Sequence, residues 1–106
     1  MPRKRELKLQ RLIELIKSNA DHIRMTFNDF IHLNELIESH TTDKLLDIGN
    51  IDHDYFIARH REKQGEYIRN MKYDIKRLRD FLATLESRLN ELEPLITKDA
   101  EEHWHE

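Results

Sequence analysis

The stretch LQRLIELIKSNADHIRMTFNDFIHLNELI, residues 9–37, predicts the fold of the chain. Its apolar residues recur at alternating steps of three and four, the heptad repeat of a helix that packs against another helix. The repeat indicates one helix from about residue 5 to about residue 39. A break at residues 18–21, with Asn19 as an N-cap, is the alternative, but the unbroken register favours a single helix. We call the repeating positions the predicted seam: Leu9, Ile13, Ile16, Ala20, Ile23, Phe27, Phe30 and Ile37, with Asn34 as its polar member.

A connection and a second long helix are expected to follow. Residues 41–43 supply N-cap candidates, residues 44–48 predict a short helix, and Gly49 suits its C-terminal end. Asp52 is then the expected cap of the second helix, in which Gly65 marks an alternative break. The apolar residues of this helix keep helical spacing: Phe56, Ile57, Ile68, Met71, Ile75, Leu78, Leu82, Leu85, Leu89 and Leu92.

Pro94 is expected to end or kink the second helix, because proline cannot donate the backbone hydrogen bond that a helix interior requires. The last residues, 94–106, are acidic and are predicted to form a flexible C-terminal tail. The expected organisation is therefore one helical domain, residues 1–93, followed by this tail.

Charge alternates along the chain. Residues 1–17, 21–54, 59–79 and 80–106 carry net charges of +4, −6, +5 and −6. An antiparallel hairpin places each basic block beside an acidic one, and such sign patterns select between helix orientations. In this arrangement the basic stretch ARHREKQGEYIRN, residues 58–70, faces Asp29, Glu35 and Glu38.

The predicted fold class is all-α: a long antiparallel helical hairpin with a short connecting helix, completing a four-helix bundle by dimerisation. Four shorter helices result if the chain breaks at Asn19 and Gly65. A second set of apolar residues gives the first helix an apolar surface that is wider than the narrow stripe a two-helix contact needs. These residues are candidates for contact with a partner protein or a second copy, and equally for the core: Leu12, Leu15, Ile31, Leu33 and Leu36.

Few residues suggest chemistry. The chain has no cysteine, which fits a reducing cytosol and excludes a thiolate nucleophile. No glycine-rich phosphate loop or serine-centred elbow motif is present, and no run of about 18 apolar residues predicts a membrane span. The seven histidines are expected on the surface, because Asp29 and His32, the nearest approach to a metal-binding pair, fall outside the predicted seam. We expect no enzymatic activity, metal or cofactor.

One short segment resembles a known family. In histidine phosphotransfer domains, which are helical bundles of about this size, an exposed histidine is followed three residues later by lysine and then at once by glycine. Here His60 and Lys63 keep that spacing, but Gln64 separates Lys63 from Gly65. The resemblance covers six residues and implies a phosphoryl-accepting role for His60. A polar helix segment is the simpler interpretation.

Basic residues at the N-terminus offer another function. Arg3, Lys4, Arg5 and Lys8 form an arm that can contact phosphates of a nucleic acid. The net charge of −3 and the acidic blocks available to each basic block argue against this reading. The sequence therefore favours a small, non-catalytic cytoplasmic adaptor or regulatory protein acting through protein–protein contacts, with a nucleic-acid-associated regulator as the alternative.

Overall fold

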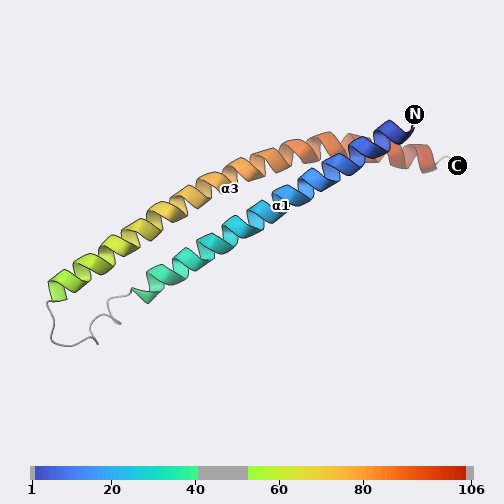
Figure 1. Ribbon diagram of the computed structural model, residues 1–106. Coiled ribbons are helices and arrows are strands. Elements are labelled where there is room, and N and C mark those ends of the chain that lie inside the picture. Colours follow the sequence, from blue (N-terminus) through green and yellow to red (C-terminus); the bar gives the residue numbers. More distant parts are fainter. Residues whose placement is uncertain (1, 41–52, 105–106) are drawn as a thin grey trace. The chain divides into compact units, whose positions relative to one another are not determined.

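Two long helices make up the part of the chain that the structure describes, residues 2–40 and 53–104 of a computed structural model (Figure 1). Helix α1 spans Pro2–Ser39 and helix α3 spans His53–Trp104. The prediction of two long helices that contact each other as a hairpin is confirmed. The predicted short helix at residues 44–48, with Gly49 at its end and the cap Asp52, lies outside the described residues.

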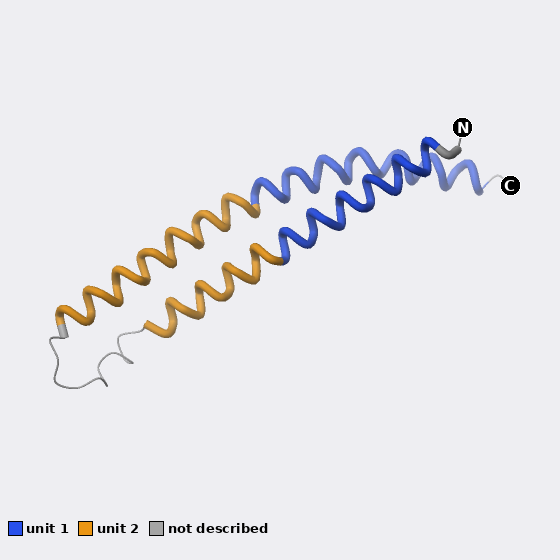
Figure 2. Tube along the Cα trace, in the orientation of Figure 1, with its two compact units in different colours: residues 1–24, 79–106 blue, residues 25–78 orange. Residues whose placement is uncertain are grey.

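The chain divides into two compact units (Figure 2). Unit 1 comprises Met1–Arg24 with Arg79–Glu106, and unit 2 comprises Met25–Leu78. Within unit 1, Arg5 pairs with Glu102, and His22 stacks on Phe81 at a ring separation of 5.5 Å. Residue numbers therefore rise along α1 as they fall along α3, so the two helix segments of unit 1 are antiparallel.

Unit 2 has the same antiparallel pairing. Asp29 of α1 interacts with Asp74 of α3, and His40, directly after α1, contacts His60. Gln64 donates from its Nε2 to the carbonyl oxygens of Ile37 at 3.0 Å and His40 at 3.1 Å. Ile37 lies in the last turn of α1 and His40 directly follows the helix, where backbone carbonyls lack the donors that the helix interior supplies. Gln64 thus caps the C-terminus of α1.

Neither helix breaks at the positions considered above. The Asn19 side chain does not cap a second helix, because its Oδ1 accepts a hydrogen bond from Arg88 of α3. Gly65 lies inside α3, where its intrinsic cost of about 1 kcal/mol is spread over a helix of 52 residues. The two-helix alternative is therefore the one that the structure shows for the described residues.

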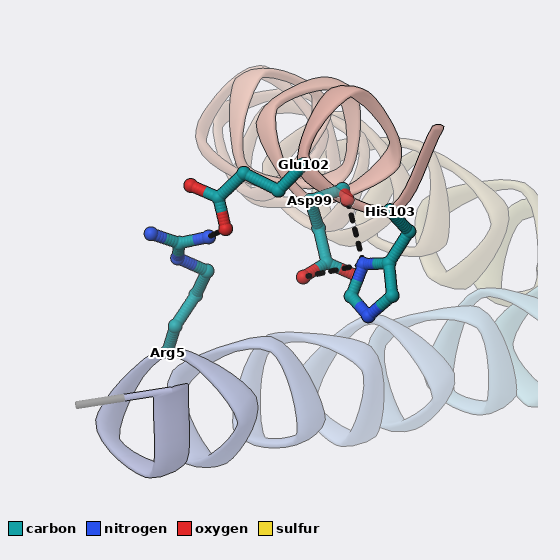
Figure 3. A network of polar contacts seen from close by, with 4 residues as sticks. All are labelled: Arg5, Asp99, Glu102 and His103. Carbon is teal, nitrogen blue, oxygen red and sulfur yellow. Dashed lines mark hydrogen bonds and ion pairs between the residues drawn. The ribbon is translucent and has the colours of Figure 1, made fainter. Parts of the chain in front are cut away.

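Of the two outcomes expected at Pro94, an end or a kink, the end is wrong, since α3 contains Pro94 and continues to Trp104. Proline removes one hydrogen bond, but contacts on its C-terminal side hold the helix against α1. Leu95 and Asp99 are half-buried there, and Glu102 accepts a hydrogen bond from Arg5 (Figure 3). Residues 94–104 are thus helical, while the division into a domain of residues 1–93 and a flexible tail of residues 94–106 stays a prediction.

The register of α1 differs from the predicted seam at every second position. Leu12, Asn19 and Thr26 are 4–5% exposed, and Leu33 is 7% exposed. The predicted seam members that follow them directly are exposed: Ile13, Ala20, Phe27 and Asn34. The other members, Leu9, Ile16, Ile23, Phe30 and Ile37, are half-buried as expected.

We call the residues that face the other helix the inner positions. On α1 and the residue that follows it, they include the series Leu12, Asn19, Thr26, Leu33 and His40, and on α3 the series His60, Tyr67, Asp74, Phe81, Arg88 and Leu95. Where two consecutive residues can both face the partner helix, a heptad pattern does not determine which of the two does so. Asn19 and Thr26 are buried although Ala20 and Phe27 are more apolar, and Asn19 accepts a hydrogen bond there from Arg88 of α3.

Candidate functional site

An apolar surface on one side of the paired helices is the first candidate site. Each of its residues follows an inner position by one residue: Ile13 follows Leu12, and Leu82 follows Phe81. One residue turns a helix by about 100° in the same sense on both helices. Because the helices are antiparallel within each unit, this turn brings both sets of side chains to the same side of the pair.

We call this surface the apolar face and define it separately in each unit. In unit 1 it consists of Ile13 on α1 with Leu82, Leu89 and Ile96 on α3, which are 46–51% exposed. In unit 2 it consists of Phe27 on α1, 51% exposed, with Ile68 and Ile75 on α3. The five α3 members recur every seven residues, from Ile68 to Ile96, and no residue of the apolar face on either helix carries a charge.

The opposite side of the pair has a different character. It is formed by residues that follow an inner position by three residues, and most of them are polar. On α3 these include Asn70, Arg77, Thr84 and Glu91, and on α1 His22 and Asp29. In each unit, the helix pair therefore has one apolar and one largely polar outer side, in addition to the apolar residues buried between the two helices.

The predicted partner-binding residues do not gather on this face. Leu12 and Leu33 are buried at inner positions, whereas Leu15 and Leu36 are half-buried. Only Ile31 is exposed, at 42%. The apolar face instead combines two members of the predicted seam, Ile13 and Phe27, with exposed apolar residues of α3. Their seven-residue recurrence on α3 was the available signal.

The predicted basic arm is partly engaged with α3. Arg5 is half-buried and pairs with Glu102, and Lys8 lies 3.8 Å from Glu91. Lys4 is exposed, and the side chain of Arg3 lies outside the described part of the chain. In the same region His103 uses its Nδ1 in a contact of 2.9 Å with the carbonyl oxygen of Asp99 (Figure 3). These contacts fit the predicted pairing of basic and acidic blocks at this end of the chain.

The predicted contact of residues 58–70 with Asp29, Glu35 and Glu38 takes a different form. The inner side of this segment consists of His60, Gln64 and Tyr67, which meet the end of α1. Its contacts there are hydrogen bonds and ring contacts. Asp29 instead lies beside another acid, Asp74.

Asp74 is the most buried ionisable side chain of the described residues, at 3% exposure. Burial, together with hydrogen bonding to and charge repulsion from the neighbouring Asp29 carboxyl, raises the pKa of its carboxyl to about 6. Arg77, at 4.0 Å, opposes this shift. The Oδ2 atom of Asp74 has no hydrogen-bond partner among the described residues.

A pocket in unit 2 is the second candidate site. It has a volume of about 170 Å³ and is lined by His40, Tyr55, Phe56, Arg59, His60 and Lys63. The Nδ1 atoms of His40 and His60 are in contact, and the two ring centroids lie 4.6 Å apart. Burial lowers the pKa of His40, and the charges of His60 and Lys63 lower it further. We call this the His40–His60 pocket.

The contact between these imidazoles bears on the resemblance to phosphotransfer domains. An exposed histidine is implied by that resemblance, whereas His60 is half-buried with its Nδ1 against His40. Gln64, the residue that interrupts the motif, has the structural role of capping α1. The contacts of His60 and Gln64 with the end of α1 therefore account for these residues through the packing of unit 2.

Two wider findings complete the description. Among the side chains that the structure describes, no three histidines, aspartates or glutamates gather closely enough to hold a metal ion. Neither described helix contains a segment that is both long and apolar enough to cross a lipid bilayer.

The fold and the two candidate sites define an all-α helical hairpin with an amphipathic exterior. Comparison of the chain with models of known families, with curated proteins and with solved structures finds no match.

Proposed function

We propose that the protein is a small, non-catalytic cytoplasmic adaptor or regulator that acts through protein–protein contacts, and that it joins a second copy of itself in a four-helix bundle. The apolar face is the observation that carries this proposal. Its side chains are about half exposed in each unit, although several are as apolar as any residue of the chain. Exposed apolar surfaces of this continuity mark interaction sites on soluble proteins.

The small core supports the same proposal. Leu12 and Leu33 are the only hydrophobic side chains that are buried in the described residues, and none is fully buried. Two helices alone form a single layer, whereas stable domains pack at least two layers around a core. A second hairpin laid on the apolar face supplies the missing layer.

A second copy fits this face for a geometric reason. A two-fold interface is formed by the same patch on both subunits, so the patch must complement itself. An uncharged stripe with seven-residue spacing meets this requirement, because an identical stripe packs against it as in a helical bundle. The charged residues beside it then form the rim of the interface, as in other protein contacts.

Analytical ultracentrifugation tests the proposal. The wild-type protein is expected to sediment as a species of twice 12.9 kDa. Replacing Leu82→Glu together with Leu89→Glu places charges in the apolar face and is expected to yield a monomer that remains helical by circular dichroism. The matched control, Asn70→Glu with Thr84→Glu, adds the same two charges at exposed residues on the opposite side of α3 and is expected to remain a dimer.

A wild-type protein that is monomeric at all accessible concentrations contradicts self-association. In that case a variant series on the apolar face is tested for loss of capture of other proteins, which is the adaptor role without the dimer. The nucleic-acid alternative stays a prediction, and the contacts of Arg5 with Glu102 and Lys8 with Glu91 weigh against it. It requires retention on nucleic acid that falls steeply with salt and with Lys4→Ala and Arg5→Ala.

A further inference from the structure

We infer that the His40–His60 pocket binds a small aromatic anion, a single ring carrying a carboxylate or a phosphate. The inference concerns unit 2 alone and does not depend on the proposed dimer. It rests on the chemistry of the lining residues, on the size of the pocket and on the electrostatic state of His40.

The lining combines rings with cations. Tyr55 and Phe56 contribute two aromatic rings, with centroids 6.0 Å apart and planes at 87°. Arg59 and Lys63 follow at four-residue steps from Tyr55, which places them on the same side of α3. His40 and His60 complete the lining, and no acidic side chain is among the six residues. A ligand that matches this surface has an apolar body and a negative charge.

The volume limits the size of the body. The pocket measures about 170 Å³. A cavity of about 150 Å³ accommodates benzene. One aromatic ring therefore fills the pocket, while its charged group reaches Arg59 and Lys63, which are exposed to solvent.

The state of His40 supports a positive potential in the pocket. Its pKa is lowered by burial, and also by the charges of His60 and Lys63, which disfavour a further positive charge. Burial disfavours a charge of either sign, whereas the charges of His60 and Lys63 favour an anion. A metal ion is less suited to the facing imidazoles, because Arg59 and Lys63 line the same pocket and repel a cation.

Nuclear magnetic resonance titration of the full chain tests the inference. Benzoate is expected to shift the amide signals of residues 55–63 and of His40 saturably. Benzamide, which has the same ring without the charge, is expected to bind about tenfold more weakly, the effect of losing one charge-assisted hydrogen bond. Acetate, which has the charge without the ring, is expected to bind about tenfold more weakly as well.

Variants locate the site. The double change Arg59→Gln and Lys63→Gln is expected to weaken benzoate binding about tenfold or more without lowering the melting temperature. The control, Arg69→Gln with Lys72→Gln, removes two exposed cations of α3 outside the pocket and is expected to leave binding unchanged. Tighter binding of phenyl phosphate than benzoate supports a phosphate ligand, and the reverse supports a carboxylate.

Three outcomes overturn the inference. Equal affinities for benzoate and benzamide show that the pocket is only an apolar surface. Unchanged benzoate affinity in the Arg59 and Lys63 double variant places binding elsewhere. The absence of any saturable shift at residues 55–63 shows that the pocket binds no such ligand.

Discussion

Asp74 has a chemistry that opposes its position. It lies at an inner position of α3 with 3% of its surface exposed, beside a second carboxyl, Asp29, whose effect on the pKa outweighs that of the nearby Arg77. A buried carboxylate loses its hydration, and the charge of Asp29 adds repulsion. The pKa of about 6 therefore means that Asp74 destabilises the folded chain mainly when it is ionised.

We predict that Asp74→Asn stabilises the protein at pH 7.5. The folded-state pKa of Asp74, about 6, is above the ordinary value of 3.8, so the folded chain binds this proton more tightly than the unfolded chain. The contribution of Asp74 to the free energy of unfolding is thus largest below about pH 4 and falls as the pH rises to about 6. A shift of about two pKa units corresponds to roughly 3 kcal/mol, which is the upper limit of the expected gain.

Urea unfolding followed by circular dichroism at pH 4 and pH 7.5 checks this prediction. The stability difference between the variant and the wild type is expected to be large at pH 7.5 and small at pH 4. Asp80→Asn, which removes an exposed carboxyl of α3, serves as the control and is expected to be neutral. A variant that is less stable than the wild type at pH 7.5 would show that the ionised carboxyl is stabilising in the folded chain.

At the scale of the helices, Gly65 and Pro94 test how far local propensity governs α3. Both residues disfavour the interior of a helix, yet α3 passes through both. The helix persists because side chains on either side of each residue contact α1. Gln64 binds the end of α1 next to Gly65, and Leu95, Asp99 and Glu102 face α1 after Pro94.

We predict that Gly65→Ala stabilises α3 by about 1 kcal/mol, the difference in helix propensity between the two residues. A Cβ atom at this position meets only Nη1 of Arg69, at 3.5 Å, which is an ordinary contact. The reciprocal change at an exposed position of the same helix, Ala58→Gly, is expected to cost about the same amount. Thermal unfolding of both variants measures the two effects. A loss of stability in Gly65→Ala would mean that the glycine is required for packing.

At the scale of the whole molecule, the distribution of apolar residues is unusual for a protein that acts as a monomer. The described residues bury few hydrophobic side chains, and they expose Phe27 while burying Thr26. Burial of apolar surface stabilises a fold or a complex by about 25 cal/mol per Å². An apolar face that stays in water does not contribute this free energy. The self-association that we propose would bury this face.

We predict that the melting temperature rises with protein concentration, because a dimer that dissociates on unfolding is stabilised by mass action. The Leu82→Glu and Leu89→Glu double variant is expected to melt at a lower temperature that no longer depends on concentration. Leu12→Ala removes a buried side chain between the two helices and is expected to lower the free energy of unfolding by about 2–5 kcal/mol. The melting temperature should therefore fall at every concentration, while its dependence on concentration remains.

Differential scanning calorimetry over a range of concentrations distinguishes these outcomes. A wild-type melting temperature that does not change with concentration would place the apolar face outside any self-contact. A concentration dependence that survives the charged substitutions would move the interface to another surface of the chain.

Much of the architecture was predictable because it depends on periodicity. The heptad spacing of residues 9–37 predicted α1 to within a few residues at its start and correctly at Ser39, and the spacing after residue 56 predicted α3. The charge blocks predicted antiparallel pairing. The candidate sites were less predictable: the pocket joins His40 to residues of α3 that are fifteen or more positions away, and no local pattern announces it.

By itself, the sequence determined that the chain is helical, that two long helices pair, and which sides of them are apolar, because all three follow from the spacing of side chains along one helix. Only the tertiary structure decided which of two neighbouring residues faces inward. Thr26 rather than Phe27 and Asn19 rather than Ala20 are buried, since that choice depends on what α3 places opposite. Likewise, α3 continues beyond Pro94 because contacts with α1 outweigh a local preference to stop.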